Sequence, residues 1–433
     1  MDKVKIFPSK LQGSVQVPSS KSMGHREIIC AGLAAGTSIV DNISMSKDIE
    51  ATMRCLKAMG VAVDEIPSMI PGRTALQITG TGHPVASEDF ADCGESGSTL
   101  RFFLPLGAML GCPLTFVGHG KLVSRPLQAY YDIFDKQFIQ YFNDNGNLPV
   151  TVNGRLQAGT FSLPGDVSSQ FVSGLLFALP LLKGDSVIEI TSPLESSAYV
   201  DMTISCLAKY GIKIINENNV HRRYIVPGNQ HYQALNSHVE GDWSQTAFWT
   251  VGGALGEAVT CMGISEDTLQ GDKAVLEIME RMSAAITRGE NSVVVSGGAT
   301  KATVIDASNC PDIIPVLSVL AAVSSGTTKI INAGRLRIKE CDRLAAMTSE
   351  LNKLGAKIME EAEGMTIEGC PEGLAGGGEV DAWNDHRIAM SLAIAAQCCK
   401  EPFVLNGAGS VSKSYPTFWE DYQSVGGKVE VLA

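Results

Sequence analysis

The sequence lacks the features that mark several large classes of protein. No window approaches the roughly 18 to 20 apolar residues that a membrane span needs, and the opening residues MDKVKIFPSK have no apolar stretch after their charges. The formal net charge is -12, which argues against a general surface for nucleic acid or acidic membranes, since such surfaces need an excess of Lys and Arg. We therefore expect a cytoplasmic protein that binds neither nucleic acid nor membranes.

Patterns typical of disulfides, metal sites and nucleotide sites are also missing. The 11 cysteines are odd in number and form no CxxC pair, and the adjacent Cys398 and Cys399 cannot form an ordinary disulfide. The 7 histidines show neither HxxxH nor HExxH spacing. No GxxxxGK[ST] occurs, and no GxGxxG opens a helix after a strand. The sequence predicts reduced core cysteines, no metal and no cofactor.

An internal repeat organises the chain. With 433 residues, 45% of them hydrophobic, the chain is long enough for two or more domains. One unit recurs six times, roughly every 70 to 75 residues: a polar loop, an apolar helix, a strand, and then a second, amphipathic helix. The apolar helices must be buried, because segments such as FVSGLLFALPLL have no polar face. The pattern predicts an α/β fold with two domains of three repeats each.

The first turns of the six apolar helices are polar in every copy. They read SSKS, GESGST, SSQ, DWSQ, CPD and NDHR. Repeats packed alike would aim these N-termini in a common direction, so that backbone N–H groups and helix dipoles converge on an anion site. The alternative is ordinary helix capping, for which Ser, Asp and Asn need no ligand. Cations in or beside these turns favour the anion site.

The first of these helices poses the question most sharply. Its opening stretch VPSSKSMGHR carries Lys21 and Arg26 and no carboxylate. Because the helix dipole favours negative charge at this end, both cations are misplaced unless an anion lies among them. We therefore expect a ligand with phosphate or carboxylate groups.

Seven motifs in order resemble the 5-enolpyruvylshikimate-3-phosphate synthase family, which the herbicide glyphosate inhibits. They are PSSKSMGHR at 18–26, GESGSTLRF at 94–102, SRP at 124–126, SSQF at 168–171, RIKECDRL at 337–344, NDHRIAM at 384–390 and KSYPTFW at 413–419. The resemblance covers essentially the whole chain. It implies a two-domain inside-out α/β barrel with six βαβαββ-type repeats, three in each domain. The implied domains are 19–238 and 1–18 with 239–433, with hinge crossovers near 18–20 and 237–241.

The resemblance also implies a reaction. The 5-hydroxyl of shikimate 3-phosphate would receive the enolpyruvyl group of phosphoenolpyruvate, with release of phosphate, in a monomeric enzyme. Shikimate 3-phosphate would be held by Lys21, Ser22, Arg26, Ser168, Ser169, Gln170, Ser196, Tyr199, Asp312 and Lys339. Phosphoenolpyruvate would be held by Lys21, Gly97, Arg125, Gln170, Arg343, His386, Arg387 and Lys413.

Three of these residues carry alternatives that the sequence leaves open. Asp312 matches the family's base, but it could simply cap the helix that follows. Arg343 and Arg387 suit bidentate binding of carboxylate or phosphate, but surface ion pairs would look the same in sequence.

The proton donor is open as well. Glu340 matches the candidate acid, although the neighbouring Lys339 and Arg343 would oppose its protonation. Lys21 is the second candidate.

Two other functions remain to be weighed. The sister transferase that acts on UDP-N-acetylglucosamine mostly carries a cysteine on the loop before Arg125, whereas the loop here reads GHGKLVSRP. A repeat protein that only binds phosphorylated metabolites would not need both Asp312 and Glu340. The sequence favours catalysis on shikimate 3-phosphate.

Overall fold

The chain forms two compact units. The computed structural model describes residues 2–70, 73–217 and 222–432. The continuous unit spans Ser19–Val239, and the discontinuous unit joins Met1–Pro18 to Glu240–Ala433. The chain therefore passes from one unit to the other twice, at 18–19 and at 239–240.

Each unit contains, in the described residues, three four-stranded sheets with one common pairing pattern. In every sheet the first strand is parallel to the second, and the other two pairings are antiparallel. The continuous unit has β14 (Ser237–His238), β3 (Ala35–Ile43), β5 (Thr74–Thr81), β4 (Ala62–Pro67); β6 (Phe90–Asp92), β7 (Leu114–Val117), β9 (Asn147–Asn153), β8 (Gln140–Asp144); and β10 (Thr160–Leu163), β11 (Ser186–Ile190), β13 (Arg223–Val226), β12 (Ile215–Glu217).

The discontinuous unit repeats this order with strands from both ends of the chain. Its sheets are β2 (Gly13–Gln16), β15 (Ala258–Met262), β17 (Ser292–Ser296), β16 (Ala285–Gly289); β18 (Val304–Asp306), β19 (Thr327–Ile331), β21 (Gly364–Glu368), β20 (Lys357–Glu361); and β23 (Glu379–Asp381), β25 (Phe403–Asn406), β1 (Lys3–Phe7), β26 (Lys428–Val431). Two further short strands of this unit, β22 (Leu374–Gly376) and β24 (Cys399–Glu401), pair in parallel with each other. The N-terminal residues thus complete two sheets of this unit.

Two helices accompany each sheet. The first helices are α1 (Lys21–Leu33), α3 (Gly97–Gly107), α5 (Ser169–Ala178), α7 (Trp243–Leu255), α9 (Ile314–Ala322) and α11 (His386–Ala395). The second helices are α2 (Lys47–Ala58), α4 (Gln128–Lys136), α6 (Ser197–Lys209), α8 (Ala274–Arg281), α10 (Arg343–Lys353) and α12 (Phe418–Ser424). Short 3-10 turns are η1 (Gly120–Ser124), η2 (Leu179–Leu181), η3 (Gly271–Lys273), η4 (Pro311–Ile313), η5 (Gly334–Ile338), η6 (Ala396–Cys398) and η7 (Ala408–Lys413).

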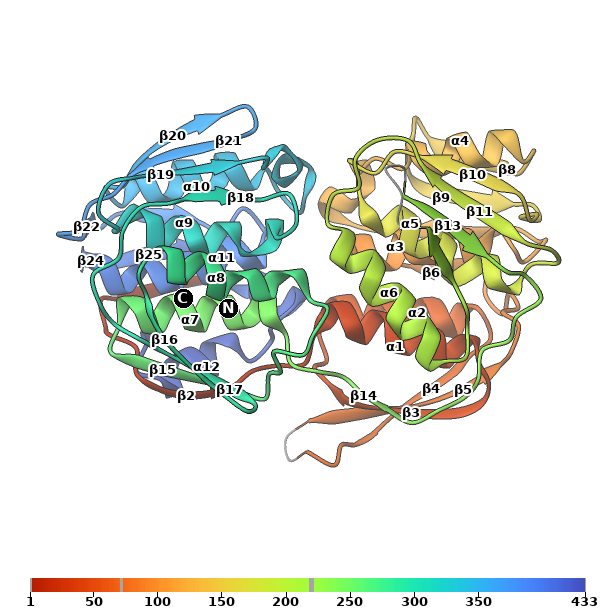
Figure 1. Ribbon diagram of the computed structural model, residues 1–433, viewed down its shortest axis with the longest axis horizontal. Coiled ribbons are helices and arrows are strands. Elements are labelled where there is room, and N and C mark those ends of the chain that lie inside the picture. The colour runs from red at the N-terminus through yellow and green to blue at the C-terminus, as the bar shows by residue number, and fades with distance from the viewer. Residues whose placement is uncertain (1, 71–72, 218–221, 433) are drawn as a thin grey trace. The chain divides into compact units, whose positions relative to one another are not determined.

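The helices lie inside and the sheets outside. Every residue of α7, α9 and α11 is buried, as their apolar sequences require. Strands such as β17 alternate buried and partly exposed residues, so one face packs on helices and the other meets solvent. Figure 1 shows strands surrounding the helices of each unit. The predicted inside-out α/β fold with six repeats is confirmed.

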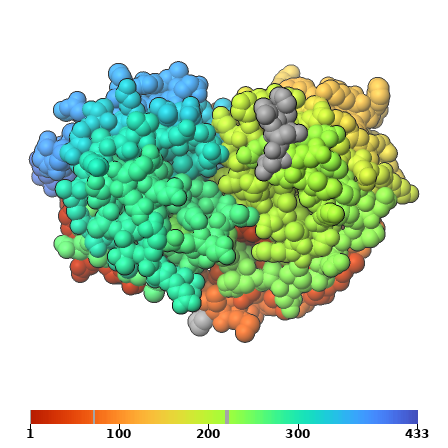
Figure 2. Space-filling model, viewed as in Figure 1, coloured from red at the N-terminus to blue at the C-terminus, as the bar shows by residue number. Residues whose placement is uncertain are grey.

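Chain segments from different repeats share the surface of each unit. On the face drawn in Figure 2, the discontinuous unit shows green, teal and blue chain side by side, with red N-terminal residues at its lower edge. Among the described residues, no helix has the length and hydrophobicity needed to cross a bilayer.

Candidate active site

The polar first turns lie at the N-termini of the buried helices. A side chain caps five of these six helices: Ser20, Ser96 and Ser168 in the continuous unit, and Asp242 and Asp385 in the discontinuous unit. Before α9 the turn η4 takes the place of a cap. Capping and the presence of predicted site residues therefore coexist at the same turns.

The N-terminus of α1 corrects the expectation that its cations await a ligand. Lys21 Nζ lies 2.7 Å from Asp48 Oδ2, and both side chains are mostly buried. Asp48 is in the first turn of α2, so the neighbouring helix supplies the carboxylate that α1 lacks. Lys21 thus already has a counter-ion, and an arriving anion must compete with Asp48 for it.

Arg26 fixes α1 against α6. Its Nε donates to Thr203 Oγ1 at 2.9 Å, and its two terminal nitrogens donate to the carbonyl oxygens of Ser22 (2.6 Å) and Tyr199 (2.8 Å). Burial lowers the pKa of Arg26 to about 10. Arg26 therefore stays charged at neutral pH while it holds the segments that carry Ser22 and Tyr199.

A second set of contacts joins α3 to α5. Gln170 Oε1 accepts from Arg101 Nη1 at 2.7 Å, and Gln170 Nε2 donates to Ser98 Oγ at 2.9 Å. The hydroxyl of Ser168 accepts from the N–H of Gln170 as the cap of α5. Because Gln170 is tied at both ends of its amide, its orientation is fixed.

Gly97 has a steric reason to be glycine. A Cβ at this position would lie 2.5 Å from Arg125 Nη1 and 2.9 Å from Arg125 Cζ. The guanidinium of Arg125, which is only 7% exposed, thus packs directly on the backbone at the start of α3. The resemblance places Gly97 against phosphoenolpyruvate, and in the structure the missing Cβ leaves room for Arg125.

A buried hydrogen-bond chain links three helices of the continuous unit. His25 Nδ1 is 2.7 Å from Thr52 Oγ1, which is 2.8 Å from Thr99 Oγ1, which in turn donates to Ser96 Oγ at 2.8 Å. Burial lowers the pKa of His25, and Lys21 and Arg26 lower it further. A neutral His25 thus joins α1, α2 and α3 without adding positive charge.

The remaining predicted residues of the continuous unit lie on α5 and α6. Ser169 is buried in the first turn of α5. Ser196 precedes α6 in a left-handed conformation with φ of 52°, and Tyr199 lies in its first turn. Hydrogen bonds join the N-terminal segments of α1, α2, α3, α5 and α6, and the hydroxyl of Ser169 takes part in none of these bonds.

In the discontinuous unit the predicted residues converge on Asp312. Its carboxylate lies 2.9 Å from Arg343 Nη1, 3.0 Å from Arg387 Nη2 and 3.5 Å from Lys339 Nζ. Asp312 belongs to η4, and the residue that precedes α9 is Ile313, which forms no side-chain cap. The capping alternative is therefore wrong, and Asp312 lies at the centre of a charge cluster.

Arg343 and Arg387 are buried, which excludes the surface ion pair as their explanation. Arg343 is 1% exposed and also contacts Glu340 Oε2 at 2.8 Å and Asp385 Oδ2 at 2.7 Å. Arg387 is 4% exposed and donates to Ser244 Oγ at 3.1 Å and to the carbonyl of Asp312 at 3.1 Å. Each guanidinium group is therefore held by several protein partners.

His386 and Lys413 complete this set. His386 is 2% exposed, with Nδ1 3.9 Å from Asp385 Oδ1. Lys413, at the end of η7, donates through Nζ to the carbonyl of Asn384 at 2.7 Å. The cluster holds Lys339, Arg343, Arg387 and Lys413 against Asp312, Glu340 and Asp385, one cation in excess of the carboxylates.

Three residues that bind the predicted cations were not predicted from the sequence. Asp48 holds Lys21, Asp385 holds Arg343, and Ser244 holds Arg387. Asp385 stands in the NDHR motif itself, directly before two predicted site residues. Its adjacency was a usable signal, whereas Asp48 and Ser244 look like ordinary helix-start residues.

Comparisons with known proteins agree with this arrangement. The model that describes EPSP synthase (3-phosphoshikimate 1-carboxyvinyltransferase) matches residues 7–422. The chain belongs to this family. It is 51% identical over 430 residues to the 3-phosphoshikimate 1-carboxyvinyltransferase of Clostridium kluyveri and 48% identical over 433 residues to that of Clostridium novyi, with 99% of each chain covered. The solved EPSP synthase of Acinetobacter baumannii superposes with a TM-score of 0.82 at 25% identity, covering 100% of both chains.

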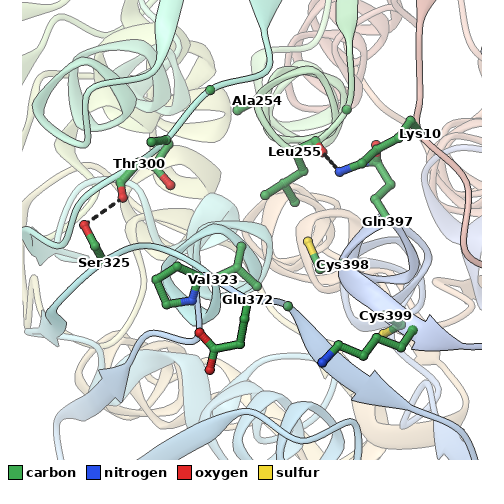
Figure 3. A pocket seen from close by; sticks show the side chains of 16 residues that line it. Lys10, Ala254, Leu255, Thr300, Val323, Ser325, Glu372, Gln397, Cys398 and Cys399 are labelled. Carbon is green, nitrogen blue, oxygen red and sulfur yellow. Dashed lines mark hydrogen bonds between the residues drawn. The ribbon is translucent and has the colours of Figure 1, made fainter.

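This member of the EPSP synthase family also has a cavity built from other residues. It measures about 540 Å³ and lies in the discontinuous unit, where α7 ends at Leu255 and α9 is followed by Val323. Figure 3 shows Lys10 reaching the carbonyl of Leu255, at 2.5 Å, and Ser325 donating to Thr300. No predicted site residue lines this cavity.

A metal site is not evident in the part of the chain that the structure describes. No group of three or more His, Cys, Asp or Glu residues there is arranged to hold a metal ion. The two sets of site residues are instead rich in cations and hydrogen-bond donors, which suit organic anions.

Proposed function

We propose that this chain transfers the enolpyruvyl group of phosphoenolpyruvate to the 5-hydroxyl of shikimate 3-phosphate and releases phosphate. The observation that carries the proposal is the cluster around Asp312, where one carboxylate contacts three cations beside Glu340. Such a cluster provides a base and an acid among donors for phosphate and carboxylate groups. Family membership over residues 7–422 supports the same reaction.

Each substrate draws residues from both sets. Shikimate 3-phosphate binds Lys21, Ser22, Arg26, Ser168, Ser169, Gln170, Ser196, Tyr199, Asp312 and Lys339 in this proposal, and phosphoenolpyruvate binds Lys21, Gly97, Arg125, Gln170, Arg343, His386, Arg387 and Lys413. The fixed orientation of Gln170 and of both buried guanidiniums supports these roles, because little side-chain freedom is lost on binding.

The chemistry proceeds by addition and elimination. Asp312 takes the proton of the 5-hydroxyl of shikimate 3-phosphate, and the hydroxyl oxygen attacks C2 of phosphoenolpyruvate. At the same time C3 gains a proton and becomes a methyl group. Loss of phosphate from C2 and of one methyl proton then restores the enol double bond. Two groups can deliver the proton to C3: Glu340 and Lys21. Holding both reactants in register can lower the barrier by about 7 to 11 kcal/mol.

A phosphate-release assay tests this function. The protein with both substrates should release inorganic phosphate, and either substrate alone should not. UDP-N-acetylglucosamine should not replace shikimate 3-phosphate. Phosphate release with the nucleotide sugar but not with shikimate 3-phosphate would assign the sister reaction instead.

Closure of the two units is part of the proposal. Each unit carries only some of the residues proposed for the reaction, and the chain connects the units at just two places, 18–19 and 239–240. We propose that these connections act as hinges in a monomer. Small-angle scattering should report a monomer mass and a smaller radius of gyration once shikimate 3-phosphate is added, and an unchanged radius would contradict closure.

The cytoplasm is the proposed location. All eleven cysteines are free thiols in the structure. Cys30 and Cys206, for example, have sulfurs 3.8 Å apart without a bond. Unpaired thiols in such numbers suit a reducing compartment.

Lys339 should give the reaction an alkaline limit. Burial lowers the pKa of Lys339 to about 8, although Asp312 opposes the shift. The cation that binds phosphate is present below this pH and is lost above it. We expect kcat/KM for shikimate 3-phosphate to fall as pH rises through about 8, and Lys339→Arg to move the limb upward, because guanidinium stays charged. An identical limb in the variant would assign it to another group.

A further inference from the structure

The segment that leads into α11 is strained. Trp383 and Asn384 are consecutive non-glycine residues, and both have φ of 53°. Bulky side chains rarely adopt this left-handed conformation, and it persists only where the surroundings enforce it. The next residues are Asp385, His386 and Arg387, so the direction of this segment sets where those side chains lie.

A buried carboxylate on another helix holds the segment. Glu350 of α10 is 1% exposed. Its Oε2 accepts from the N–H of Asp381 at 2.9 Å, and its Oε1 accepts from Trp383 Nε1 at 3.0 Å. Glu350 thus binds the segment at two places, the backbone N–H of Asp381 and the indole N–H of Trp383.

Glu350 is ionised in this environment. Burial alone raises the pKa of Glu350, but hydrogen bonds from Lys353, Trp383 and the Asp381 backbone outweigh burial and lower it. Lys353 Nζ contacts the two carboxylate oxygens at 2.9 and 2.7 Å from the solvent side, where its side chain is 49% exposed. A charged acceptor forms stronger hydrogen bonds than a neutral one, which suits a residue that must hold a strained backbone.

Helix α10 therefore holds the start of α11 at two points. Arg343 binds Asp385, the cap of α11, and Glu350 follows Arg343 by seven residues, or two turns of the same face. Lys413 adds a third contact through the carbonyl of Asn384. Arg343 is needed for binding in the proposed function, whereas Glu350 has no substrate to contact there.

We propose that Glu350 is a positioning residue for phosphoenolpyruvate binding, acting through the strained segment 381–384 to place His386 and Arg387. The inference rests on the proposed function for its kinetic consequence, but its structural part stands apart from it. Because the residues that bind shikimate 3-phosphate lie mostly on α1, α5 and α6, the effect of Glu350 is selective for one substrate.

The test compares Glu350→Gln with Glu350→Ala in the full chain. Glutamine keeps one acceptor oxygen but turns an NH2 group toward donors, and alanine removes both acceptors. We expect KM for phosphoenolpyruvate to rise about tenfold in the glutamine variant and more in the alanine variant, because Arg387 is misplaced. KM for shikimate 3-phosphate should stay within about twofold.

A spectroscopic readout accompanies the kinetics. In a spectrum of 15N-labelled indole groups, the Trp383 N–H signal, assigned through Trp383→Phe, should move upfield in both Glu350 variants as its charged acceptor is lost. Glu368→Gln is the matched control: it changes a carboxylate of the same unit that pairs with Lys357 at the surface, where the two side chains are 62% and 59% exposed, so KM and the indole signal should remain near wild type.

Three results would overturn the proposal. They are an unmoved Trp383 signal in Glu350→Gln, an equal rise of both KM values, and a Glu368→Gln variant that reproduces the Glu350 effects. If Glu350→Ala does not fold, Glu350→Gln decides. A wild-type protein that releases no phosphate would refute the proposed function, and the indole signal would then decide whether Glu350 holds the segment.

Discussion

Asp312→Asn should lower kcat by about 10² to 10⁴, the range that a positioned general base contributes. The side chain keeps its shape, so the loss reports the missing proton acceptor. KM for the two anionic substrates should not rise, because the variant removes one negative charge from a cluster that contains Lys339, Arg343 and Arg387. Steady-state phosphate release at saturating and limiting substrate separates the two parameters.

The fold should survive this substitution. Arg343 keeps its contacts to Glu340 and Asp385, and Arg387 keeps Ser244. Asp306→Asn is the matched control. Asp306 ends β18 six residues earlier and bonds Ser308 and Asn332 at the surface, so its variant should retain wild-type kcat. A raised KM with unchanged kcat in Asp312→Asn would make Asp312 a binding residue rather than the base.

The repeat could be predicted from sequence because its signal is local. Segments such as IIPVLSVLAA of α9 are apolar on all sides, and only a central position in the fold accommodates that. Pairing of the strands is another matter. β14 has only two residues, and it completes a sheet by pairing with β3. Ser237 of β14 lies opposite Val40 of β3, which comes almost 200 positions earlier in the chain. Such short strands carry too little pattern to fix a partner.

The site divides in the same way. Lys21 and Arg26 could be singled out because cations at a helix start contradict the dipole. The carboxylate partner of Lys21 could not, because Asp48 stands where helices ordinarily begin with acidic residues. Glu350 in the middle of α10 is equally unremarkable in sequence. A residue that obeys local rules hides any second role until its tertiary contacts are known.

Arg343→Lys tests the cation that contacts three carboxylates of the cluster. Arg343 is 1% exposed and its three nitrogens reach Asp312, Glu340 and Asp385. An ammonium group has no fork and cannot span these three carboxylates. We expect kcat/KM for phosphoenolpyruvate to fall about 10²-fold or more, since hydrogen bonds to charged groups contribute about 1.5 to 3 kcal/mol each.

Stability should fall with activity. Asp385 is fully buried, and its ion pair in the described residues is to Arg343 and, more distantly, to His386. Leaving a buried charge without its partner costs about 3 to 5 kcal/mol. Arg343→Ala should therefore lower the thermal midpoint more than Arg343→Lys, by several degrees in calorimetry.

The control for Arg343 is an exposed arginine that also bridges carboxylates. Arg288 contacts Glu266 and Glu280, and its side chain is 40% exposed. Exposed ion pairs contribute about 0 to 1 kcal/mol, so Arg288→Lys should change neither the midpoint nor kcat/KM measurably. If Arg343→Lys behaves like Arg288→Lys, the fork is not required, and positive charge alone explains the cluster. If only stability falls, Arg343 serves Asp385 and not the substrate.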